Sequence, residues 1–400
     1  MKNLIILGST GSIGINTLDV VKRNINKFNI YALVAKSNVD LMTKQCLIFN
    51  PKYVCMTDEQ AAIELEKSLS LHKIYTKIKV LAGFDSACEL SALKEVDIVM
   101  SAIVGIAGLL PTLSALKAGK KVLLANKESL VTCGKILIKE LCKNRACLIP
   151  VDSEHSAIFQ SLPKSFQNAL GRASFDEHGI SRIILTASGG PFRNISLTEL
   201  SKVTPKQACN HPNWSMGKKN SVDSATMMNK GLEYIAGRWL FNASSKGIDI
   251  LLHPQSIIHS MVSYIDGSLL AQLSIPDMRI PIAYAMGFPE RISINIRSLD
   301  LSFLEKLNFY SIDKNRYPCL QLAISASNDG QSASIILNAA NEVAVEAFLN
   351  ERIRFNRIAD VIKRVLDSLV IKEPESIEEI LWIDQQARKE AILSVNHFNN

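Results

Sequence analysis

Short apolar runs alternate with longer amphipathic stretches over the first 150 residues. The first run, residues 3–7, is followed by a helical pattern through Thr17, Leu18, Val20 and Val21. Similar runs predict further strands at residues 30–35, 53–56, 79–81, 96–100, 121–125 and 146–149. This alternation predicts an α/β domain with a doubly wound, mostly parallel sheet of the Rossmann-like kind.

The pattern becomes mixed after this first part. Strands are expected at residues 181–185, 253–262 and 268–273. Helices are expected at residues 155–162 and from about 224 to 240. Asp266-Gly267 between the last two strands indicates an antiparallel hairpin, and an exposed sheet edge there would suit a dimer interface. The middle of the chain is therefore expected to be an α+β domain.

The C-terminal part predicts a small helical bundle. Periodicity weakens from Pro289 to Pro318 and then returns as helical spacing. The helices are expected at about residues 320–327, 333–350, 358–369 and 377–396. The expected organisation is 1–150, 151–288, a linker at 289–313, and a helical domain at 314–400. A polar cluster in the bundle, for which a structural role is expected, consists of Asn338, Asn341 and Glu342.

Composition narrows the functional classes. The net charge of +7 suits an anionic small molecule, whereas the scattered basic residues argue against nucleic acid. The eight cysteines form no CxxC pair, as expected of reduced thiols in a cytoplasmic protein. The most apolar window, residues 98–116, is interrupted by Gly105, Gly108 and Pro111 and predicts a strand, turn and helix rather than a membrane span. The N-terminus reaches a glycine-rich turn too soon for a signal peptide.

A glycine-rich turn directly follows the first strand. Gly8, Gly11 and Gly14 have the spacing G-x-x-G-x-x-G between a strand and a helix, which suits a dinucleotide pyrophosphate, although a plain strand–helix turn is the alternative. The second strand ends at Lys36-Ser37-Asn38, without the acid that an NAD site uses. This favours NADPH.

Two carboxylates follow the seventh predicted strand, in Val151-Asp152-Ser153-Glu154-His155. In an extended segment Asp152 and Glu154 would share one face and Ser153 would point the other way. Oxygen ligands of this kind suit Mg²⁺ or Mn²⁺, and two solvated acids at a strand end are the alternative. The preceding strand runs into Asn126-Lys127-Glu128-Ser129. There a lysine can neutralise an anionic intermediate, unless the segment is a surface loop capped by Ser129.

A second polar group is expected on the helix at 224–240. Asn229, Lys230 and Glu233 have spacings of three and four, so they share one helical face, and Glu233 is a third carboxylate able to meet the other two. Ser188, in the small-residue loop 186–192, and Ser224 are further donors for a phosphate ester. The segment 210–219, with His211, Trp214 and Met216, reads as a loop that folds over a ligand.

Taken together, these motifs resemble one enzyme family over essentially the whole chain. The motifs are V-D-S-E-H, N-K-E-S, T-A-S-G-G-P-F, H-P-N-W-S-M-G-K, S-V-D-S-A-T-M-M-N-K-G-L-E and H-P-Q-S-I-I-H-S-M. In this combination they resemble 1-deoxy-D-xylulose 5-phosphate reductoisomerases, which make 2-C-methyl-D-erythritol 4-phosphate with NADPH and a divalent metal in the non-mevalonate isoprenoid pathway. The resemblance implies a homodimer.

The resemblance also implies residue roles. The implied metal ligands are Asp152, Glu154 and Glu233, with Mg²⁺, Mn²⁺ or Co²⁺ as the ion. The implied catalytic residues are Lys127, Glu154 and His211. The implied substrate contacts are Lys127, Ser153, Glu154, Ser188, His211, Trp214, Ser224, Asn229, Lys230 and Glu233. The implied NADPH contacts are Thr10, Gly11, Ser12, Ile13, Lys36, Ser37, Asn38, Asn126, Glu128 and Gly217.

The chain departs from the family at two positions. Family members often have Gly-Lys-Asn where this chain has Lys36-Ser37-Asn38, and a Glu where it has Ala236. If Ser153 contacts substrate, the segment must leave strand geometry at that residue. The rival functions are another NAD(P)-dependent sugar-phosphate or semialdehyde dehydrogenase, a metal-dependent phosphate-ester hydrolase, and a nucleotide-sensing protein without turnover.

Overall fold

The computed structural model of the protein describes residues 1–72, 77–214 and 216–398. The chain divides into two compact units. The first unit comprises residues 1–129, 137–156 and 277–297, and the second comprises residues 130–136, 157–276 and the described chain from 298. The boundaries near residues 150, 288 and 313 stay a prediction.

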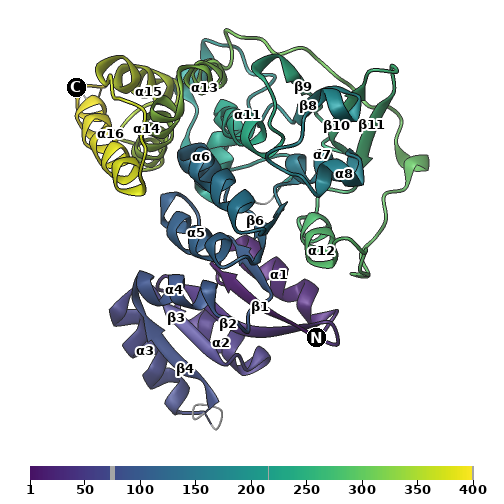
Figure 1. Ribbon diagram of the computed structural model, residues 1–400. Coiled ribbons are helices and arrows are strands. Elements are labelled where there is room, and N and C mark those ends of the chain that lie inside the picture. Colours follow the sequence, from purple (N-terminus) through teal and green to yellow (C-terminus); the bar gives the residue numbers. More distant parts are fainter. Residues whose placement is uncertain (73–76, 215, 399–400) are drawn as a thin grey trace. The chain divides into compact units, whose positions relative to one another are not determined.

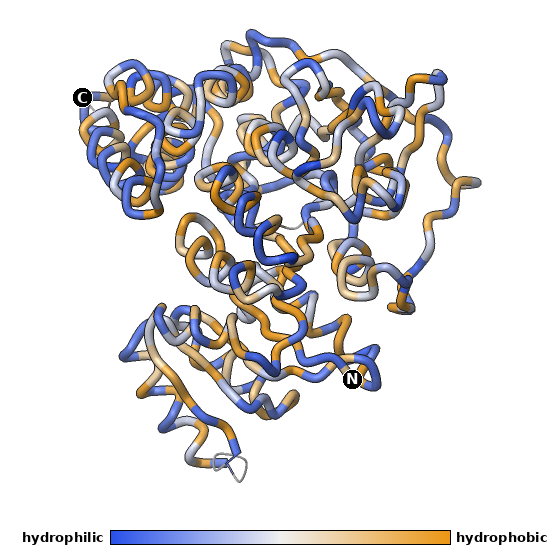
Figure 2. Tube along the Cα trace, in the orientation of Figure 1, coloured by the Kyte–Doolittle hydropathy of each residue, from blue (hydrophilic) through white to orange (hydrophobic). Residues whose placement is uncertain are grey.

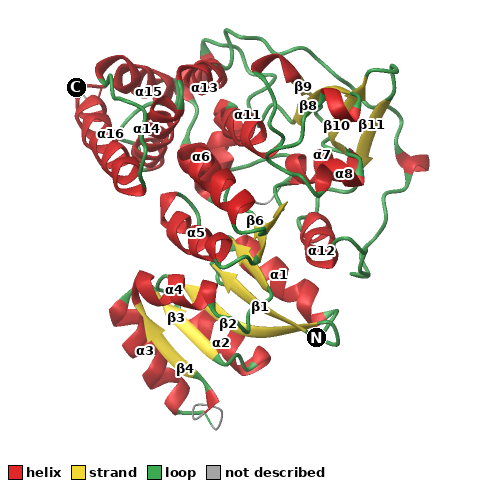
Figure 3. Ribbon diagram, viewed as in Figure 1, coloured by secondary structure: helices red, strands yellow, loops and turns green. Residues whose placement is uncertain are grey.

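A seven-stranded sheet forms the centre of the first unit, in the order β4-β3-β2-β1-β5-β6-β7. Its strands are β1 (Lys2–Leu7), β2 (Phe28–Ala35), β3 (Tyr53–Met56), β4 (Lys79–Ala82), β5 (Ile98–Ser101), β6 (Lys121–Leu124) and β7 (Cys147–Pro150). Every pairing is parallel, and β1 lies in the middle, so the expected doubly wound sheet is confirmed (Figure 3). The strands read as apolar runs because such sheets are covered on both faces (Figure 2).

Helices alternate with these strands, as the sequence pattern predicts. They are α1 (Ser12–Lys22), α2 (Val39–Phe49), α3 (Glu59–Ser70), α4 (Gly83–Ala92), α5 (Leu109–Lys117) and, much later in the chain, α12 (Arg279–Gly287). Two more helices, α6 (Glu128–Lys143) and α7 (Ser153–Ser161), contribute residues to both units. The window 98–116 forms β5, a turn and most of α5, as expected. Among the described residues, no helix is long and apolar enough to cross a membrane.

The second unit contains a four-stranded sheet in the order β11-β10-β8-β9. Its strands are β8 (Ile180–Ala187), β9 (Ile248–Leu252), β10 (Ile258–Tyr264) and β11 (Leu269–Leu273). β8 pairs parallel with β9 and antiparallel with β10, and β10 and β11 form the expected antiparallel hairpin.

The strand expected at residues 253–262 is wrong in its first half. Pro254 cannot donate a ladder hydrogen bond, and Ser256 has a left-handed φ of 52°, so residues 253–257 form a turn and the strand begins at Ile258. β9 was not predicted. It is a short strand, and its burial does not alternate from one residue to the next.

The C-terminal helices confirm the expected bundle. They are α13 (Pro318–Asp329), α14 (Gln331–Leu349), α15 (Arg357–Ser368) and α16 (Ile377–Phe398), and the last three lie side by side (Figure 1). Most side chains of α14 are buried, which explains its largely apolar sequence. The short helices of this unit are α8 (Lys164–Gln167) and α9 (Pro205–Ala208).

The single helix expected at residues 224–240 is two helices, α10 (Lys218–Thr226) and α11 (Met228–Leu240). The break is at Met227, which is buried and has a left-handed φ of 60°. α10 also begins six residues earlier than expected, because its polar sequence hides the buried spacing of Val222 and Ala225. Residues 218–223 therefore belong to a helix and not to the polar loop before it.

Candidate active site

The glycine-rich turn in the first unit is tightly packed and leads into a helix whose N-terminus has no side-chain cap. Gly8 has a φ of +86°, and a Cβ there would come within 2.6 Å of the Ala102 carbonyl oxygen. A Cβ at Gly14 would come within 2.3 Å of the Gly8 carbonyl oxygen. α1 begins at Ser12, its N-cap Gly11 offers no side-chain cap, and its first turn has no acidic residue. The backbone N–H groups at Ser12 and Ile13 thus face an end of the helix suited to an anion.

The segment Lys36-Ser37-Asn38 lies at the same edge of the sheet. The backbone N–H groups of Gly8 and Ser9 donate to the Val34 carbonyl at 2.8 and 2.9 Å, so the glycine turn begins beside the end of β2. The segment Lys36-Ser37-Asn38 follows that end and is exposed. Asn38 is the N-cap of α2, because its Oδ1 accepts a hydrogen bond from the Leu41 N–H at 3.1 Å.

Asn126, which follows β6, forms side-chain hydrogen bonds with the backbone of two different segments. Its amide nitrogen donates to the carbonyls of Ile103 and Gly105 at 2.5 and 2.9 Å, and its Oδ1 accepts from the Ser129 N–H at 3.2 Å. The start of α6 is therefore capped by Asn126, and not by Ser129 as the surface-loop alternative supposed. Glu128 next to it is buried. The contacts of Asn126 and Glu128 with a nicotinamide remain a proposal.

The strand-edge cluster, defined here as Lys127, Asp152, Ser153 and Glu154, lies at the ends of the paired strands β6 and β7. Lys127 Nζ donates to Asp152 Oδ2 at 2.6 Å, and these side chains are 11% and 14% exposed. Asp152 and Glu154 offer carboxylate oxygens within 4.8 Å of each other. Ser153 Oγ donates to Glu154 Oε2 at 2.5 Å. One lysine charge against two carboxylates leaves a net negative site, as a divalent cation requires.

The backbone of this cluster differs from the extended segment first assumed. β7 ends at Pro150, and Ser153 is the first residue of α7, so the departure from strand geometry at Ser153 is confirmed. The strict alternation of faces was therefore wrong, and the helix starts two residues before His155. His155 is buried, and its Nδ1 lies 3.7 Å from Asp152 Oδ1. Its proximity to Asp152 was missed, although three residues is the spacing of neighbours on a helix.

The helix cluster, defined here as Asn229, Lys230 and Glu233, lies on α11 in the second unit. Asn229 donates to Glu233 Oε1 at 2.6 Å, and Lys230 donates to Glu233 Oε2. The side chains of Lys230 and Glu233 are 4% and 0% exposed. The shared helical face expected from the spacing is therefore confirmed, and it carries a buried carboxylate with a cation and an amide as partners.

The loop 186–192 brings Ser188 to His211 and to α10. Ser188 Oγ lies 2.9 Å from His211 Nε2. The backbone N–H groups of Asn213 and Trp214 donate to His211 Nδ1 at 3.1 and 3.0 Å, so Nε2 carries the ring proton. Gly190 has a φ of +70°, and a Cβ there would come within 2.7 Å of the Ser224 carbonyl oxygen. The second glycine of T-A-S-G-G-P-F therefore permits close contact with α10.

The polar segment before α10 is tied to the sheet of the second unit. Asn213 donates to the Pro254 carbonyl at 2.8 Å and to Ser256 Oγ at 2.9 Å. The Trp214 and His259 rings lie 5.9 Å apart. Met216 and Gly217 precede α10, and Ser215 of the same motif lies outside the described residues. Closure of this segment over a ligand remains a proposal.

Two further histidines, His253 and His259, lie in the interior of the second unit. His253 is buried, and its ring lies 2.9 Å from the Asn308 carbonyl oxygen. Burial lowers the pKa of His253, which favours a neutral core histidine. His259 is buried, and its Nε2 lies 2.8 Å from Ser274 Oγ.

Comparisons with known proteins cover this chain along most of its length. The profile described as 1-deoxy-D-xylulose 5-phosphate reductoisomerase matches residues 4–134, and those of two C-terminal domains of that enzyme match residues 148–241 and 273–390. The reductoisomerase of Blochmanniella pennsylvanica (strain BPEN) is 60% identical over 98% of this chain and 99% of its own. That of Baumannia cicadellinicola is 59% identical over 99% of both.

Solved structures give the same result. A crystal structure of a DOX-P reductoisomerase with NADPH, fosmidomycin and magnesium has a TM-score of 0.95 and 42% identity, covering 99% of this chain and 98% of its own. The enzyme from Zymomonas mobilis in complex with NADPH has a TM-score of 0.89 and 41% identity, covering 98% of this chain and 99% of its own.

Proposed function

Because the chain belongs to the 1-deoxy-D-xylulose 5-phosphate reductoisomerase family, we propose that the strand-edge cluster and the helix cluster serve one reaction. The protein catalyses the NADPH-dependent rearrangement and reduction of 1-deoxy-D-xylulose 5-phosphate to 2-C-methyl-D-erythritol 4-phosphate, in the non-mevalonate isoprenoid pathway. NADPH and a divalent metal are its cofactors. The assignment of individual residues to these tasks is our proposal.

Asp152, Glu154 and Glu233 hold the divalent ion. The support is the donor chemistry: carboxylate oxygens alone suit a hard cation, and the strand-edge cluster has an excess of negative charge. The ion is Mg²⁺, Mn²⁺ or Co²⁺. When bound, it stabilises negative charge on the carbonyl and hydroxyl oxygens of the substrate. Glu233 is held for this task by Asn229 and Lys230 in a buried position.

The anionic end of the substrate binds to side chains of the second unit. The donors are Ser188, His211, Ser224, Asn229 and Lys230, with Ser153 from the strand-edge cluster and Trp214 covering the substrate. The support is that Ser188, His211 and α10 already lie against one another. Since the ring proton of His211 is on Nε2, this histidine donates toward Ser188 and the substrate side.

Lys127, Glu154 and His211 are the catalytic residues. Lys127 carries a positive charge to the edge of the sheet and neutralises negative charge that develops on the substrate. Glu154 fixes the orientation of the Ser153 hydroxyl by accepting its hydrogen bond. The closed site excludes water from the reacting atoms.

NADPH binds along the edge of the parallel sheet. The pyrophosphate lies on Thr10, Gly11, Ser12 and Ile13, at the N-terminus of α1. The 2′-phosphate is read by the exposed segment Lys36-Ser37-Asn38, where Lys36 supplies the charge. Asn126, Glu128 and Gly217 complete the cofactor site. When bound, NADPH supplies the hydride that reduces the rearranged aldehyde.

The main support for this proposal is that the sheet of the first unit carries two features together. It presents a dinucleotide turn after β1 and a negatively charged, lysine-paired carboxylate cluster after β6 and β7. A simple dehydrogenase needs no such carboxylates, and a phosphate-ester hydrolase needs no dinucleotide turn.

The test is an assay of the purified protein with 1-deoxy-D-xylulose 5-phosphate, NADPH and Mg²⁺ or Mn²⁺, followed by cofactor absorbance. We expect NADPH oxidation that requires all three components. If a folded protein does not oxidise NADPH under these conditions, the assignment is wrong.

We also propose that the protein is a cytoplasmic homodimer that pairs through β11. β11 is an edge strand, and its Leu269 and Leu270 are 52% and 49% exposed. A cytoplasmic location agrees with the state of the eight cysteines, which form no disulfide in the described structure. Sedimentation should give twice the chain mass, and Leu270→Lys should give the monomer. Ile48→Lys, at an exposed position on α2, is the matched control and should leave the dimer intact.

A further inference from the structure

The helices and the loop proposed to hold the substrate's anionic end share one support. Each is bonded to, or packed directly against, the C-terminal helices α13 and α14 or the turn just before α13. These helices carry no residue of the proposed site. Their contacts therefore show what the C-terminal bundle adds to the second unit beyond its own packing.

α10, which carries Ser224, is bonded to α14 by two buried side chains. Asn341 donates to Asp223 Oδ1 at 2.9 Å across a separation of 118 residues. Both residues are fully buried. Lys219, one turn earlier on α10, lies 2.8 Å from Asp223 Oδ2. A buried carboxylate is costly unless it is fully paired, so this bond fixes the position of α10 against α14.

α11 and the loop 186–192 are held by α13 and by the turn before it. A Cβ at Gly231 would come within 2.4 Å of Ala323 Cβ, so α11 packs closely on α13. Tyr317 donates to the Gly189 carbonyl at 3.1 Å. Arg316 donates to the carbonyls of Phe192 and Ile195 at 3.2 and 2.7 Å. The loop beside Ser188 therefore has the same support as the helices.

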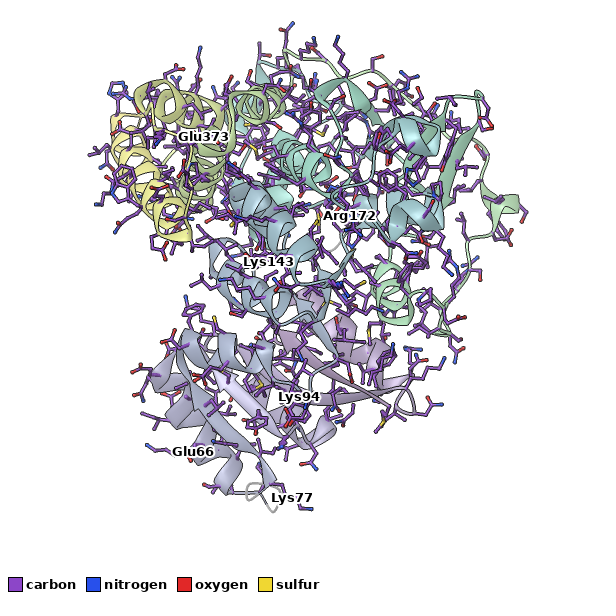
Figure 4. The ribbon with its side chains drawn as sticks, in the orientation of Figure 1. Glu66, Lys77, Lys94, Lys143, Arg172 and Glu373 are labelled. Carbon is purple, nitrogen blue, oxygen red and sulfur yellow. The ribbon has the colours of Figure 1, made fainter. Side chains whose placement is uncertain are left out.

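α14 is itself anchored at its start. The Glu373 carboxylate accepts from the Gln331 and Ser332 N–H groups at 2.9 and 3.0 Å, and from Ser332 Oγ at 2.8 Å. Glu373 lies among the C-terminal helices (Figure 4). An acid at the N-terminus of a helix accepts hydrogen bonds from the free N–H groups there and interacts favourably with the positive end of the helix dipole. Asn341 therefore projects from a helix whose start is fixed.

We propose that Asn341 is a positioning residue for the substrate's anionic end, and that it acts through Asp223 on the Ser224 hydroxyl. This rests on the proposed function, which makes Ser224 a contact of that end. Asp223 and Ser224 are consecutive on α10, so a rotation or shift of the helix moves both. Asp223 faces the bundle, whereas Ser224 is partly exposed. A misplacement of about 1 Å is enough to weaken a bonded contact severely.

The first test is the variant Asn341→Leu, which keeps the size of the side chain and removes its donor. We expect the KM for 1-deoxy-D-xylulose 5-phosphate to rise about tenfold, the loss of roughly one hydrogen bond, while the affinity for NADPH stays the same. Asn338→Leu is the matched control. Asn338 is equally buried on α14, but its amide donates to Glu342 on the same helix at 3.3 Å. It should change the melting temperature and leave KM unchanged.

The second test is rescue by exchange of the two partners. Asn341→Asp alone places two carboxylates face to face in a buried position and should have the largest effect on KM. The double variant Asp223→Asn with Asn341→Asp restores one donor and one acceptor. We expect its KM to return to within about threefold of the parent value, because the hydrogen bond is re-formed in the opposite direction. The exchange of the two partners still tests the proposal if Asn341→Leu fails to fold.

Ser224→Ala separates this inference from the proposed function. If Ser224→Ala raises KM and Asn341→Leu behaves like Asn338→Leu, the positioning role is overturned and the proposed site stands. If Ser224→Ala leaves KM unchanged, the assignment of Ser224 fails, and the positioning role fails with it. Absence of rescue in the double variant, with the fold intact, also contradicts the inference.

Discussion

The strand-edge cluster and the helix cluster both place a lysine against a carboxylate, but they are built in different ways. Lys127 and Asp152 are 25 residues apart in the sequence and meet because β6 pairs with β7. Their side chains are 11% and 14% exposed. Lys230 and Glu233 are three residues apart on one helix, and their side chains are 4% and 0% exposed.

This difference has an energetic consequence. A charge at the edge of a sheet keeps some solvent and tolerates the loss of its partner, whereas a fully buried charge does not. We therefore expect the helix cluster to be a fixed part of the site and the strand-edge cluster to be its adaptable part. The following variants test that contrast.

The largest effect is expected for Glu233→Gln. Loss of a proposed metal ligand should lower kcat by roughly a thousandfold or more, because several kcal/mol of charge stabilisation depend on the ion. The affinity for NADPH, measured by fluorescence titration, should be nearly unchanged. Glu346→Gln, at an exposed position on α14, is the control. Loss of NADPH binding in Glu233→Gln would mean that the metal site is misplaced.

The two lysines compare the clusters directly. Lys230→Met leaves the Glu233 carboxylate buried without its cation and should lower the free energy of unfolding by about 3–5 kcal/mol. Lys127→Met should lower it by about 1 kcal/mol, because the Asp152 carboxylate is partly solvated. Denaturant titration measures both, with the exposed Lys44→Met as control. Equal losses for Lys127 and Lys230 would remove the contrast between the clusters.

Lys36→Ala tests the cofactor side of the sheet edge. Removing this charge should weaken NADPH by about tenfold, as expected for one charge-assisted contact, and should change NADH little. Lys44→Ala, on the neighbouring helix α2, should affect neither cofactor. A similar loss for NADPH and NADH would contradict the assignment of the 2′-phosphate to this segment.

Lys121 extends the comparison to a lysine held by carbonyls. Its Nζ donates to the carbonyls of Met286 and Phe288 at 3.2 and 2.9 Å, and burial lowers the pKa of Lys121 from 10.5 to about 8. Between pH 8 and 10.5 the unfolded chain binds the additional proton, so this group's contribution to stability rises with pH there.

The matching experiment compares Lys121→Met with the parent protein. The destabilising effect of the buried charge is fully present below pH 8. The stability of the variant relative to the parent should therefore fall by about 1 kcal/mol between roughly pH 8 and 10, after a discount for partial solvation. A difference that does not depend on pH would contradict the lowered pKa.

The sequence predicts well those parts in which periodicity and chemistry agree. The parallel strands and the four C-terminal helices follow from apolar spacing, and the hairpin follows from that spacing together with the turn residues Asp266-Gly267. The shared face of Asn229, Lys230 and Glu233 follows from helical geometry. In each of these cases a local rule is enough, because neighbouring residues determine the outcome.

The parts that were missed depend on single backbone angles or on distant contacts. The break between α10 and α11 requires a left-handed φ at buried Met227. A methionine in the sequence does not indicate such a backbone conformation. The bond between Asp223 and Asn341 joins residues 118 positions apart, so no local pattern contains it. Ser153 was assigned to a strand because helix α7 starts without an apolar signal of its own.

The central claim is the proposal that Asp152, Glu154 and Glu233 hold one divalent ion. Titration with Mn²⁺, followed by electron paramagnetic resonance without substrate, tests it most directly. We predict one tight site per chain, weakened by about a hundredfold or more in both Asp152→Asn and Glu233→Gln, with less than the sum of the two losses in the double variant. Parent-like Mn²⁺ affinity in Glu233→Gln, or additive losses in the double variant, would contradict a shared site.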